Sequence, residues 1–336
     1  MIGLDIAKTV FQVHGEDEAG RVVLQRRLSR AALEKFFAAL PPARVGMEAC
    51  GSAHHWARTL RTMGHEVRLV PAAYVKPFVR RNKTDARDAA AICAALRHPD
   101  MRTVPVKSVE QSCARGLERA RDLLVRQHTQ LANAMRGLLA EVGVVAPQGR
   151  RGLAQLAALI DAADAAIPSV LLAGAQALLA QWRGTAEAIA ALEKRLLERA
   201  RADATMRRLM DIPGIGALSA HAIVAAIGDG KQFRSARDFA AWAGLTPREH
   251  QSANKRRAGG ISRQGDGGLR RLLVLGASAV IRQAKSRPER ASAWQSGILS
   301  RRPVKVAVVA QAAKNARVAW AVLTRGTTYR TGSATA

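Results

Sequence analysis

The order of apolar runs in the N-terminal third of the sequence limits the folds that the chain can adopt. Three short β-rich runs come first, and only short polar turns such as 18–21 separate them. Helical and strand-like segments then alternate, so the predicted order is β-β-β-α-β-α-β-α. Strands joined by hairpins and followed by such an alternation indicate a mixed sheet with helices on its faces. The predicted strands are 2–7, 9–17, 22–29, 43–49 and 65–71, and the predicted helices are 29–40, 53–64 and 84–97.

The remaining sequence is predominantly helical. Apolar residues recur at helical spacing through 108–143, 152–166 and 168–203, and the length of the last segment suggests a paired, coiled-coil-like helix. We interpret this segment as a structural arm or a dimer interface. A basic helix is predicted at about 303–325, and the polar, basic stretch 247–268 has the composition of a loop.

These patterns predict a chain of the α/β plus α class with several parts. We expect a mixed-sheet domain at 1–105, a helical segment at 106–204, a helical C-terminal domain at 205–330 and a tail at 331–336.

The charge of the chain indicates a polyanionic partner. Lys and Arg number 53 against 26 Asp and Glu, a formal net charge of +27. Neutralising phosphates releases their counterions and drives binding, so nucleic acid is the expected partner. No apolar run is long enough to span a bilayer, so no membrane partner is expected. The three cysteines are widely spaced, as expected for reduced thiols in a cytoplasm.

Four acidic residues stand where a metal site could form. Asp5 lies within an apolar strand, and Glu48 lies at the end of the fourth strand; a carboxylate buried there needs a cation or a donor. Asp85 and Asp88 are three residues apart, so they share one helix face about 5–6 Å from each other. Oxygen ligands of this kind suit Mg²⁺, which can assist phosphodiester cleavage.

Each acid also has an ordinary interpretation by itself. Asp85 could cap its helix, Asp88 could pair with Arg87 or Arg81, and Glu48 could form a salt bridge. The four acids together, in this strand order, favour the metal site. The neighbouring cations Arg80, Arg81 and Lys83 are then expected to lie against phosphates.

The order of elements and the acidic set resemble the RuvC/ribonuclease-H-like fold. More closely, "GLDIAKTVFQVHG", "VGMEACGSAHHWAR", "VKPFVRRNKTDARDAAAI", "IPGIG", "FAAWAGLTPR" and "GGISRQGDGGLRRLL" resemble the DEDD transposases of one bacterial insertion-sequence family, the bridge-RNA-guided serine recombinases. The resemblance extends over residues 1–330. It is closest to the branch with the "MEACGSAHHWAR" signature.

Two segments of the C-terminal third are expected to contact nucleic acid. The turn "IPGIG", 212–216, has the pattern of a helix-hairpin-helix, in which backbone N–H groups at Gly214 and Gly216 bind a phosphate; a plain tight turn between helices is the alternative. The stretch 247–268 is basic and glycine-rich, and a disordered basic linker is its alternative. The cations expected to contact nucleic acid there are Lys255, Arg256, Arg257 and Arg263.

The resemblance also implies a nucleophile in this stretch. In the family the loop supplies the serine that attacks DNA, and Ser252 matches its place. The sequence departs from the family pattern at Gln251, where serine is common, and at Ala253 and Asn254, where small glycines are usual. Ser262 is the second candidate.

The function implied by the resemblance is RNA-guided DNA recombination. Asp5, Glu48, Asp85, Asp88 and Ser252 would be catalytic, with Mg²⁺ as cofactor and a phosphoserine intermediate. The partners would be donor DNA, target DNA and a structured guide RNA, with base pairing supplying sequence choice. A homodimer or homotetramer in the bacterial cytoplasm, associated with the nucleoid, is implied. The alternatives are a metal-dependent junction-resolving nuclease that uses water, and a non-catalytic nucleic-acid-binding factor.

Overall fold

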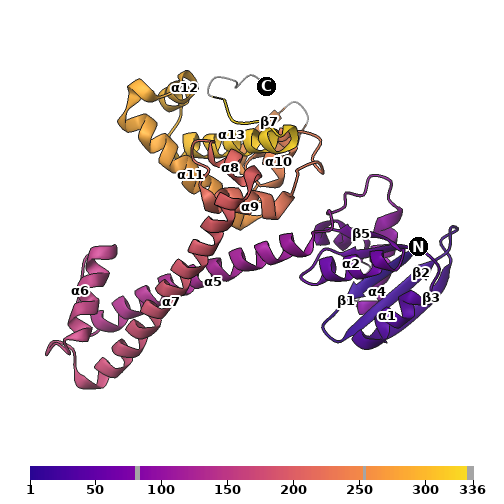
Figure 1. Ribbon diagram of the computed structural model, residues 1–336, viewed down its shortest axis with the longest axis horizontal. Coiled ribbons are helices and arrows are strands. Elements are labelled where there is room, and N and C mark those ends of the chain that lie inside the picture. The colour runs from indigo at the N-terminus through magenta and orange to yellow at the C-terminus, as the bar shows by residue number, and fades with distance from the viewer. Residues whose placement is uncertain (80–83, 253–254, 331–336) are drawn as a thin grey trace. The chain divides into compact units, whose positions relative to one another are not determined.

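The computed structural model describes residues 1–79, 84–252 and 255–330, with the backbone alone at 250, 252 and 255–258. The chain divides into two compact units, Met1–Ser112 and Cys113–Ala336. Figure 1 shows the elements of each unit. Within the described residues, none of the helices combines the length and the apolar character that crossing a membrane would require.

A five-stranded mixed sheet forms the centre of the first unit, in the order β3-β2-β1-β4-β5. β1 pairs antiparallel with β2, and β2 with β3, whereas β1–β4 and β4–β5 are parallel. All five strands lie within the segments predicted from the sequence, so the mixed sheet is confirmed. The strands are β1 (Ile2–Ile6), β2 (Val10–Glu16), β3 (Val22–Ser29), β4 (Arg44–Glu48) and β5 (Glu66–Val70).

Helices cover both faces of this sheet. Leu4 of β1 and Met47 of β4 are fully buried in a core that α1 (Arg30–Ala38) and α2 (Ala53–Thr62) complete with Phe37 and Trp56. The opposite face is covered by α4 (Asp85–Arg97), which contacts β1, β2 and β4. Because strand residues alternate between the faces, the neighbours of Leu4 on β1 point toward α4. The short helices α3 (Ala72–Val75) and η1 (Lys76–Phe78) precede α4.

Side-chain caps fix where α1 and α4 begin. The Ser29 hydroxyl accepts a hydrogen bond from the Ala32 N–H at 3.3 Å, so Ser29 is the N-cap of α1. Thr84 caps α4 in the same way, because its hydroxyl accepts from the Arg87 N–H at 3.4 Å. Thr84 rather than Asp85 is therefore the N-cap, which leaves the Asp85 carboxylate available for another role.

Two long helices and a short one open the second unit. These are α5 (Val109–Ala140), α6 (Arg150–Asp161) and α7 (Ser169–Ala202). Leu139 of α5, Ile160 of α6 and Leu179 of α7 belong to one apolar cluster, which holds the three helices together at one end (Figure 1). Nearer the other end, the Arg121 guanidinium of α5 pairs with the Glu193 carboxylate of α7 at 2.5 Å.

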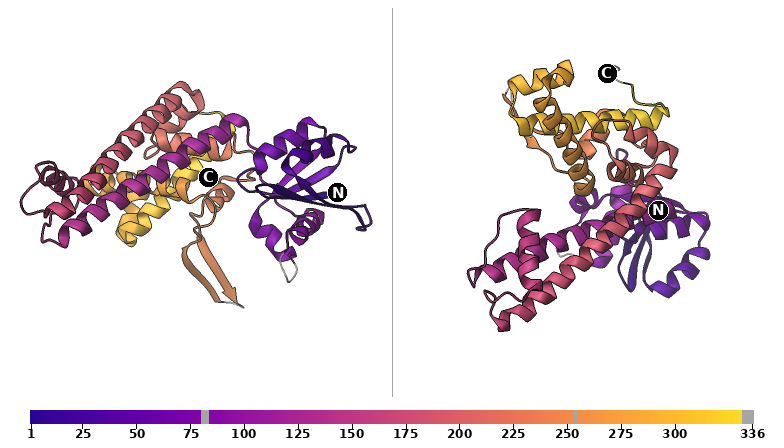
Figure 2. Two further views of the ribbon diagram at one scale, coloured as in Figure 1. Left: turned by 90° about the horizontal axis from the view of Figure 1, so that it is seen from below. Right: turned by 60° about the vertical axis from the view of Figure 1, so that its left-hand side comes forward.

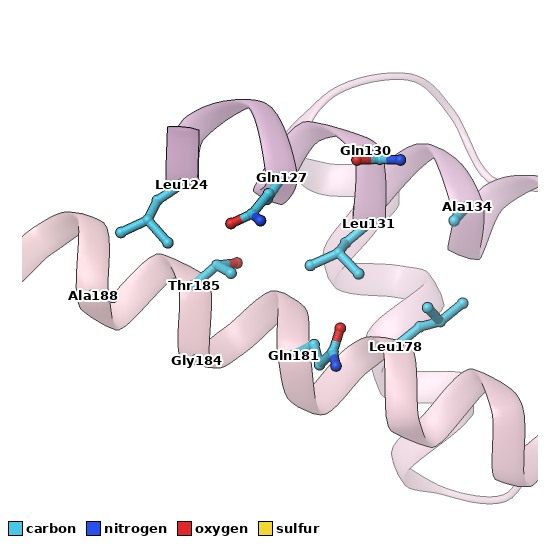
Figure 3. Close-up of a pocket in the computed structure, with 10 residues that line it drawn as sticks. All are labelled: Leu124, Gln127, Gln130, Leu131, Ala134, Leu178, Gln181, Gly184, Thr185 and Ala188. Atoms are coloured by element: carbon cyan, nitrogen blue, oxygen red, sulfur yellow. The ribbon is translucent and has the colours of Figure 1, made fainter. Parts of the chain in front are cut away.

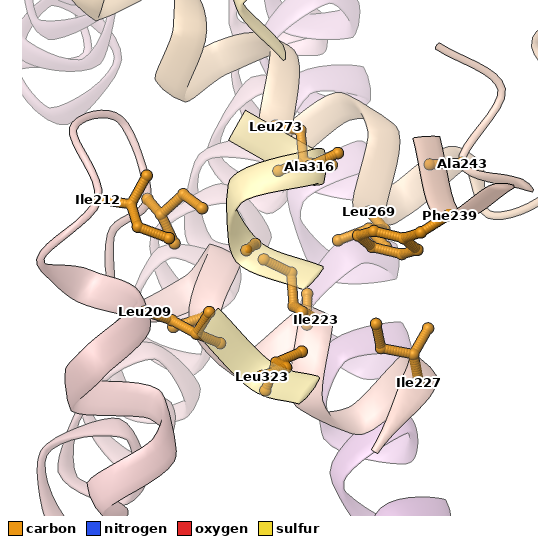
Figure 4. Packing of buried hydrophobic residues seen from close by; sticks show 14 of the residues in the cluster. Leu209, Ile212, Ile223, Ile227, Phe239, Ala243, Leu269, Leu273, Ala316 and Leu323 are labelled. Atoms are coloured by element: carbon orange, nitrogen blue, oxygen red, sulfur yellow. The ribbon is translucent and has the colours of Figure 1, made fainter. Parts of the chain in front are cut away.

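The remaining helices pack around a second core, shown in Figure 4. Ile223, Phe239 and Leu273 are buried in it from three different helices. The C-terminal helix passes through the middle of this core and contributes Ala316 and Leu323, which confirms the helix predicted at about 303–325. The elements are α8 (Ala204–Met210), α9 (Ala217–Ile227), α10 (Ala236–Trp242), α11 (Gly267–Ser286), η2 (Pro288–Arg290), α12 (Ala293–Arg301) and α13 (Val304–Arg325).

The polar stretch predicted as a loop is instead largely a β-hairpin, so that prediction was wrong. β6 (Pro247–Ser252) and β7 (Lys255–Ile261) pair antiparallel and project away from the helices of the second unit (Figure 2). The hairpin does not bury one face on a core, so its sequence lacks the alternation of apolar and polar residues that identifies most strands. Its base is fixed, because the Ser262 N–H donates to the Thr246 carbonyl at 2.8 Å and the Arg263 N–H donates to the Gly244 carbonyl at 3.2 Å.

Candidate functional site

Three carboxylates converge at one edge of the first unit. Each of Asp5, Asp85 and Asp88 offers a carboxylate oxygen, and these oxygens all lie within 4.8 Å of one another. Asp5 is near the carboxyl end of β1, and the other two are in the first turn of α4. These three residues were expected to converge from their positions in the sequence, and the structure brings them together. Hard oxygen ligands at this spacing can hold a divalent cation.

The crowding of these acids has an electrostatic consequence at Asp5. The pKa of Asp5 is raised from 3.8 to about 6. Burial is the largest cause, followed by the negative charges of Asp88, Asp85 and Glu48 in that order. A cation among the carboxylates would offset both causes, so the donor set fits a divalent metal.

Glu48 lies next to this group without belonging to the 4.8 Å cluster. Leu4 pairs with Met47 in the parallel ladder, so Asp5 and Glu48 occupy the following positions on β1 and β4. From this position the negative charge of Glu48 helps to raise the pKa of Asp5. The role of Glu48 as a metal ligand stays a prediction.

Two glycines determine how closely α4 approaches the sheet. Gly3 and Gly46 face each other in the β1–β4 ladder, two residues before Asp5 and Glu48 respectively. A Cβ atom on Gly3 would lie 2.1 Å from the Ala89 carbonyl oxygen of α4, and one on Gly46 would lie 2.1 Å from Cδ1 of Leu96. The absence of these Cβ atoms lets α4 lie against β1, which brings its first turn to Asp5. Neither glycine was singled out from the sequence, although a glycine inside a strand is a signal of close backbone approach.

The other candidate residues of this unit lie outside the described residues. Arg80, Arg81 and Lys83 directly precede α4, within 80–83. Their contact with phosphates stays a prediction.

The candidate nucleophile lies in the projecting hairpin. Ser252 is the last residue of β6, and its backbone pairs with that of Lys255 at the first position of β7. Arg256 and Arg257 follow on β7, paired with Gln251 and His250. The hairpin therefore carries Ser252 and three cations at its far end, while Ala253 and Asn254 lie outside the described residues. Ser262, the second candidate, lies at the base instead, where its hydroxyl accepts from the Gln264 N–H at 3.5 Å.

The glycine-rich turn connects α8 to α9. Gly214 has a φ of +87°, and a Cβ atom there would lie 2.8 Å from the Gly276 carbonyl oxygen of α11, so this position requires glycine for packing. Gly216 is the N-cap of α9 and has open space around its Cα, so a ligand could approach the first N–H groups of this helix. Arg263 has a φ of +56°, which is uncommon for a residue other than glycine, at the base of the hairpin.

A groove of about 560 Å³ lies between α5 and α7 (Figure 3). Leucines and glutamines line it, including Leu124, Gln127, Leu131 and Gln181. None of its ten lining residues is titratable, so it offers no group for acid–base chemistry or for metal binding by a carboxylate.

Comparison with known proteins agrees with this arrangement. Residues 2–144 match a DEDD-type transposase model, and residues 206–293 match the model described as "Transposase IS116/IS110/IS902 family". The chain is 49% identical over 335 residues to the "Probable family 20 transposase" of Pseudomonas aeruginosa, covering 98% of both chains. It is 40% identical over 334 residues to the transposase for insertion sequence element IS1111A of Coxiella burnetii, covering 99% of this chain and 92% of the relative. The transposase for IS1328 of Yersinia enterocolitica is 37% identical over 329 residues, with 98% of both chains covered.

The mixed sheet, the aspartate cluster and these matches define a DEDD transposase, an enzyme that breaks and joins DNA strands and whose acidic domain indicates use of a divalent metal. The chain belongs to the IS110 family of insertion-sequence transposases.

Proposed function

We propose that this transposase is an RNA-guided recombinase that cuts and rejoins DNA through a serine–DNA intermediate, with Mg²⁺ held by its acidic residues. The observation that carries the catalytic part is the convergence of Asp5, Asp85 and Asp88 within 4.8 Å. The RNA-guided part rests on the resemblance to the bridge-RNA-guided recombinases and on the net charge of +27.

Asp5, Asp85, Asp88 and Glu48 would hold the metal. A bound Mg²⁺ supplies positive charge that stabilises the oxygens of a phosphodiester during cleavage. The chain positions its own groups for this step, because β1 and β4 fix two of the acids on a sheet and α4 fixes the other two in one helical turn. Asp5 must lose its proton to act as a ligand, and its raised pKa means that it holds this proton to a higher pH than an ordinary aspartate does.

Ser252 would be the nucleophile. Its hydroxyl oxygen would form a bond to phosphorus, and the bond from phosphorus to the leaving sugar oxygen would break as that oxygen takes up a proton. The cations Lys255, Arg256 and Arg257 on the paired strand would hold the attacked phosphate. The hairpin is anchored at its base and projects at its tip (Figure 2). This arrangement suits a serine that attacks a DNA strand bound away from the helical core of the second unit.

Phosphate contacts by the remaining elements would position the nucleic acid. The α8–turn–α9 segment would act as a helix-hairpin-helix, with the N–H groups after Gly216 binding a phosphate and Gly214 fixing the turn on α11. Arg80, Arg81, Lys83 and Arg263 would contribute further contacts. The guide RNA would supply sequence choice by base pairing to donor and target DNA.

Assembly of more than one copy would complete the enzyme. In the family that the sequence resembles, the serine and the acids of one site come from different subunits, which implies a homodimer or homotetramer. The long helices α5 and α7 would form a coiled-coil-like arm in this assembly. We place its action at the nucleoid in the bacterial cytoplasm, where its DNA substrates lie.

Covalent trapping tests the proposal. Wild type, Ser252→Ala, Ser262→Ala and Asp88→Asn are each incubated with labelled DNA, Mg²⁺ and RNA that co-purifies with the protein, and are then denatured. We expect DNA attached to wild type and Ser262→Ala, and none attached to Ser252→Ala or Asp88→Asn. Equal binding of the RNA by all four proteins would show that the variants are folded.

Other outcomes separate the alternatives. Cleavage without an adduct in wild type would support a nuclease that uses water. An adduct that persists in Ser252→Ala and is lost in Ser262→Ala would move the nucleophile to the base of the hairpin. Binding with neither cleavage nor an adduct would support a non-catalytic factor.

A further inference from the structure

A corner of the second unit carries unusually dense positive charge. The segment 285–305 forms the end of α11, η2, α12 and the start of α13, and it contains one acidic residue, Glu289, against six basic ones. The whole chain has about two basic residues for each acidic one. We call this surface the basic corner, and its six cations are Lys285, Arg287, Arg290, Arg301, Arg302 and Lys305.

These cations are available for a ligand. All six are exposed, and among the described residues no carboxylate forms an ion pair with any of them. Several exposed cations elsewhere in the chain do form ion pairs, such as Arg183 with Asp161 at 2.6 Å and Lys231 with Asp229 at 3.4 Å. Unneutralised like charges repel one another, and the counterions that they gather are released when a polyanion binds.

The same segment carries an exposed aromatic ring. Trp294, in the first turn of α12, is 37% exposed, and Lys314 of α13 places its Nζ 4.7 Å from a ring centroid of the same side chain. Val304 and Val306 are also exposed at the start of α13, so the corner is apolar as well as basic. An exposed aromatic ring between cations is the arrangement that proteins use to stack an unpaired base while binding the neighbouring phosphates. A base inside a duplex is already stacked and cannot use such a ring.

A chain of buried amides fixes α12 in place. The Gln295 side chain of α12 donates to the Gln311 side chain at 3.2 Å, and Gln311 donates to the Asn315 side chain at 2.7 Å. Asn315 in turn donates to the Pro213 carbonyl, in the turn between α8 and α9, at 2.9 Å. Gln311 and Asn315 are 5% and 2% exposed, so this connection is within the protein interior. These hydrogen bonds hold α12 of the basic corner and the glycine-rich turn in a fixed arrangement. Such an arrangement suits two phosphate contacts along one strand of nucleic acid.

We propose that the basic corner binds an unpaired strand of nucleic acid, with phosphates on its cations and a base stacked on Trp294. Three of the six cations, Arg301, Arg302 and Lys305, and the stacking residue Trp294 lie outside the C-terminal segment that matches the family model. The proposal concerns binding alone, so it does not depend on the nucleophile or on the metal.

Binding of short labelled oligonucleotides to the full chain tests this inference. The strands are a single-stranded RNA, a single-stranded DNA of the same sequence and the DNA duplex, and binding is measured by fluorescence anisotropy over a range of salt. The Asp88→Asn background and EDTA remove cleavage from the measurement. The corner variant is Arg287→Gln, Arg290→Gln and Arg302→Gln combined. Its matched control is Arg21→Gln, Arg183→Gln and Lys231→Gln combined, which removes the same charge from cations that are already paired.

The expected result is specific to the corner. The corner variant should bind single strands at least about tenfold more weakly at low salt, with a salt slope smaller by roughly 2, since each lost contact to a single strand accounts for about 0.7. The control should bind as the parent does. Equal weakening of both variants would mean that only net charge matters, and no weakening of the corner variant would exclude the site. The comparison of RNA with DNA identifies which strand is preferred.

Substitution of the tryptophan tests the stacking step. Trp294→Leu should bind single strands roughly tenfold more weakly while binding the duplex unchanged, and Trp294→Phe should keep most of the affinity. Far-ultraviolet circular dichroism and the melting temperature identify any variant that fails to fold. A folded Trp294→Leu protein with unchanged preference for single strands would overturn the stacking contact.

Discussion

Gly3 of β1 lies directly against Ala89 of α4, so close that a Cβ atom on Gly3 would be 2.1 Å from the Ala89 carbonyl oxygen. Ala89 is the residue after Asp88, and Gly3 is two residues before Asp5 on the same face of the sheet. The distance between the helix and the sheet therefore determines the distance between their carboxylates.

Gly3→Ala should weaken metal binding without unfolding the sheet. The clash is with backbone atoms, so α4 must move, and overpacking of this kind costs about 1–3 kcal/mol of unfolding free energy. Displacement of α4 would move Asp85 and Asp88 away from Asp5, and we expect the affinity for Mn²⁺ to fall by about 10- to 100-fold. Isothermal titration calorimetry measures the affinity, and urea unfolding measures the stability.

Gly137→Ala is a suitable control, because nothing lies within 4 Å of the added Cβ on α5. This variant should keep wild-type metal affinity. Unchanged Mn²⁺ affinity in Gly3→Ala would show that α4 does not depend on this contact for its position.

Gly46→Ala should be rescued by a second substitution, which distinguishes it from Gly3→Ala. Its added Cβ would meet Cδ1 and Cγ of the Leu96 side chain at 2.1 and 2.7 Å. Leu96→Ala removes both atoms, so the two substitutions should be coupled by about 1 kcal/mol or more in a double-mutant cycle of unfolding free energies. Strictly additive effects would mean that Leu96 moves aside at no cost.

The fold of the first unit was predictable because its signals are local. Three apolar runs with tight turns, followed by alternating helices and strands, leave few arrangements other than a mixed sheet. Ser29 and Thr84 are of residue types that favour the N-cap position, and each caps the start of its helix. The hairpin at 247–261 could not be identified by the same signals, because a projecting hairpin needs no buried face and therefore shows no period-2 alternation.

The acidic cluster was predictable from residue type and spacing, but its geometry was not. Helical periodicity places Asp85 and Asp88 on one face. Asp5 and Glu48 share a face of the sheet because of the β1–β4 register, in which Leu4 pairs with Met47. Which face of the sheet α4 covers, and how closely, depends on packing between segments distant in sequence, at Gly3 and Gly46. The amide chain from Gln295 to Pro213 also depends on such packing, because it joins α12, α13 and the α8–α9 turn, which are separate in the sequence.

Asp5→Asn should stabilise the metal-free protein at high pH while abolishing cleavage. The folded protein holds a proton on Asp5 up to about pH 6, whereas the ordinary pKa of an aspartate side chain is 3.8. The contribution of Asp5 to the free energy of unfolding is therefore fully present below about pH 4. It is lost as the pH rises through 6, because the folded state must then bury an ionised Asp5 carboxylate. Asparagine removes that cost, so the melting temperature in EDTA should exceed that of wild type at pH 8.

The same comparison near pH 4 is the control, since Asp5 is then largely protonated and the difference should nearly vanish. Mn²⁺ at pH 8 should raise the melting temperature of wild type more than that of Asp5→Asn. A metal-free Asp5→Asn protein that is less stable than wild type at pH 8 would show that burial and the neighbouring charges do not penalise the ionised Asp5 carboxylate.

Glu118→Leu should destabilise the second unit by about 3 kcal/mol, because it breaks a buried ionic network. His221 is fully buried, and its Nδ1–H donates to the Glu118 carboxylate at 2.7 Å. Arg115 contacts both Glu118 and Asp266, the residue that caps α11 just after the hairpin. Removal of Glu118 leaves His221 and part of Arg115 buried without their acceptor.

The double variant Arg115→Met, Glu118→Leu separates the network from simple packing. Apolar side chains of similar size should recover part of the lost unfolding free energy, because the uncompensated cation is then gone, while Asp266 still accepts from the Leu269 N–H at 2.9 Å. Urea unfolding of the two single variants and the double variant measures the coupling between the residues. A double variant that loses the full sum of the two single variants would show that these charges act independently. A Glu118→Leu variant that costs less than about 1 kcal/mol would show that the network contributes little to stability.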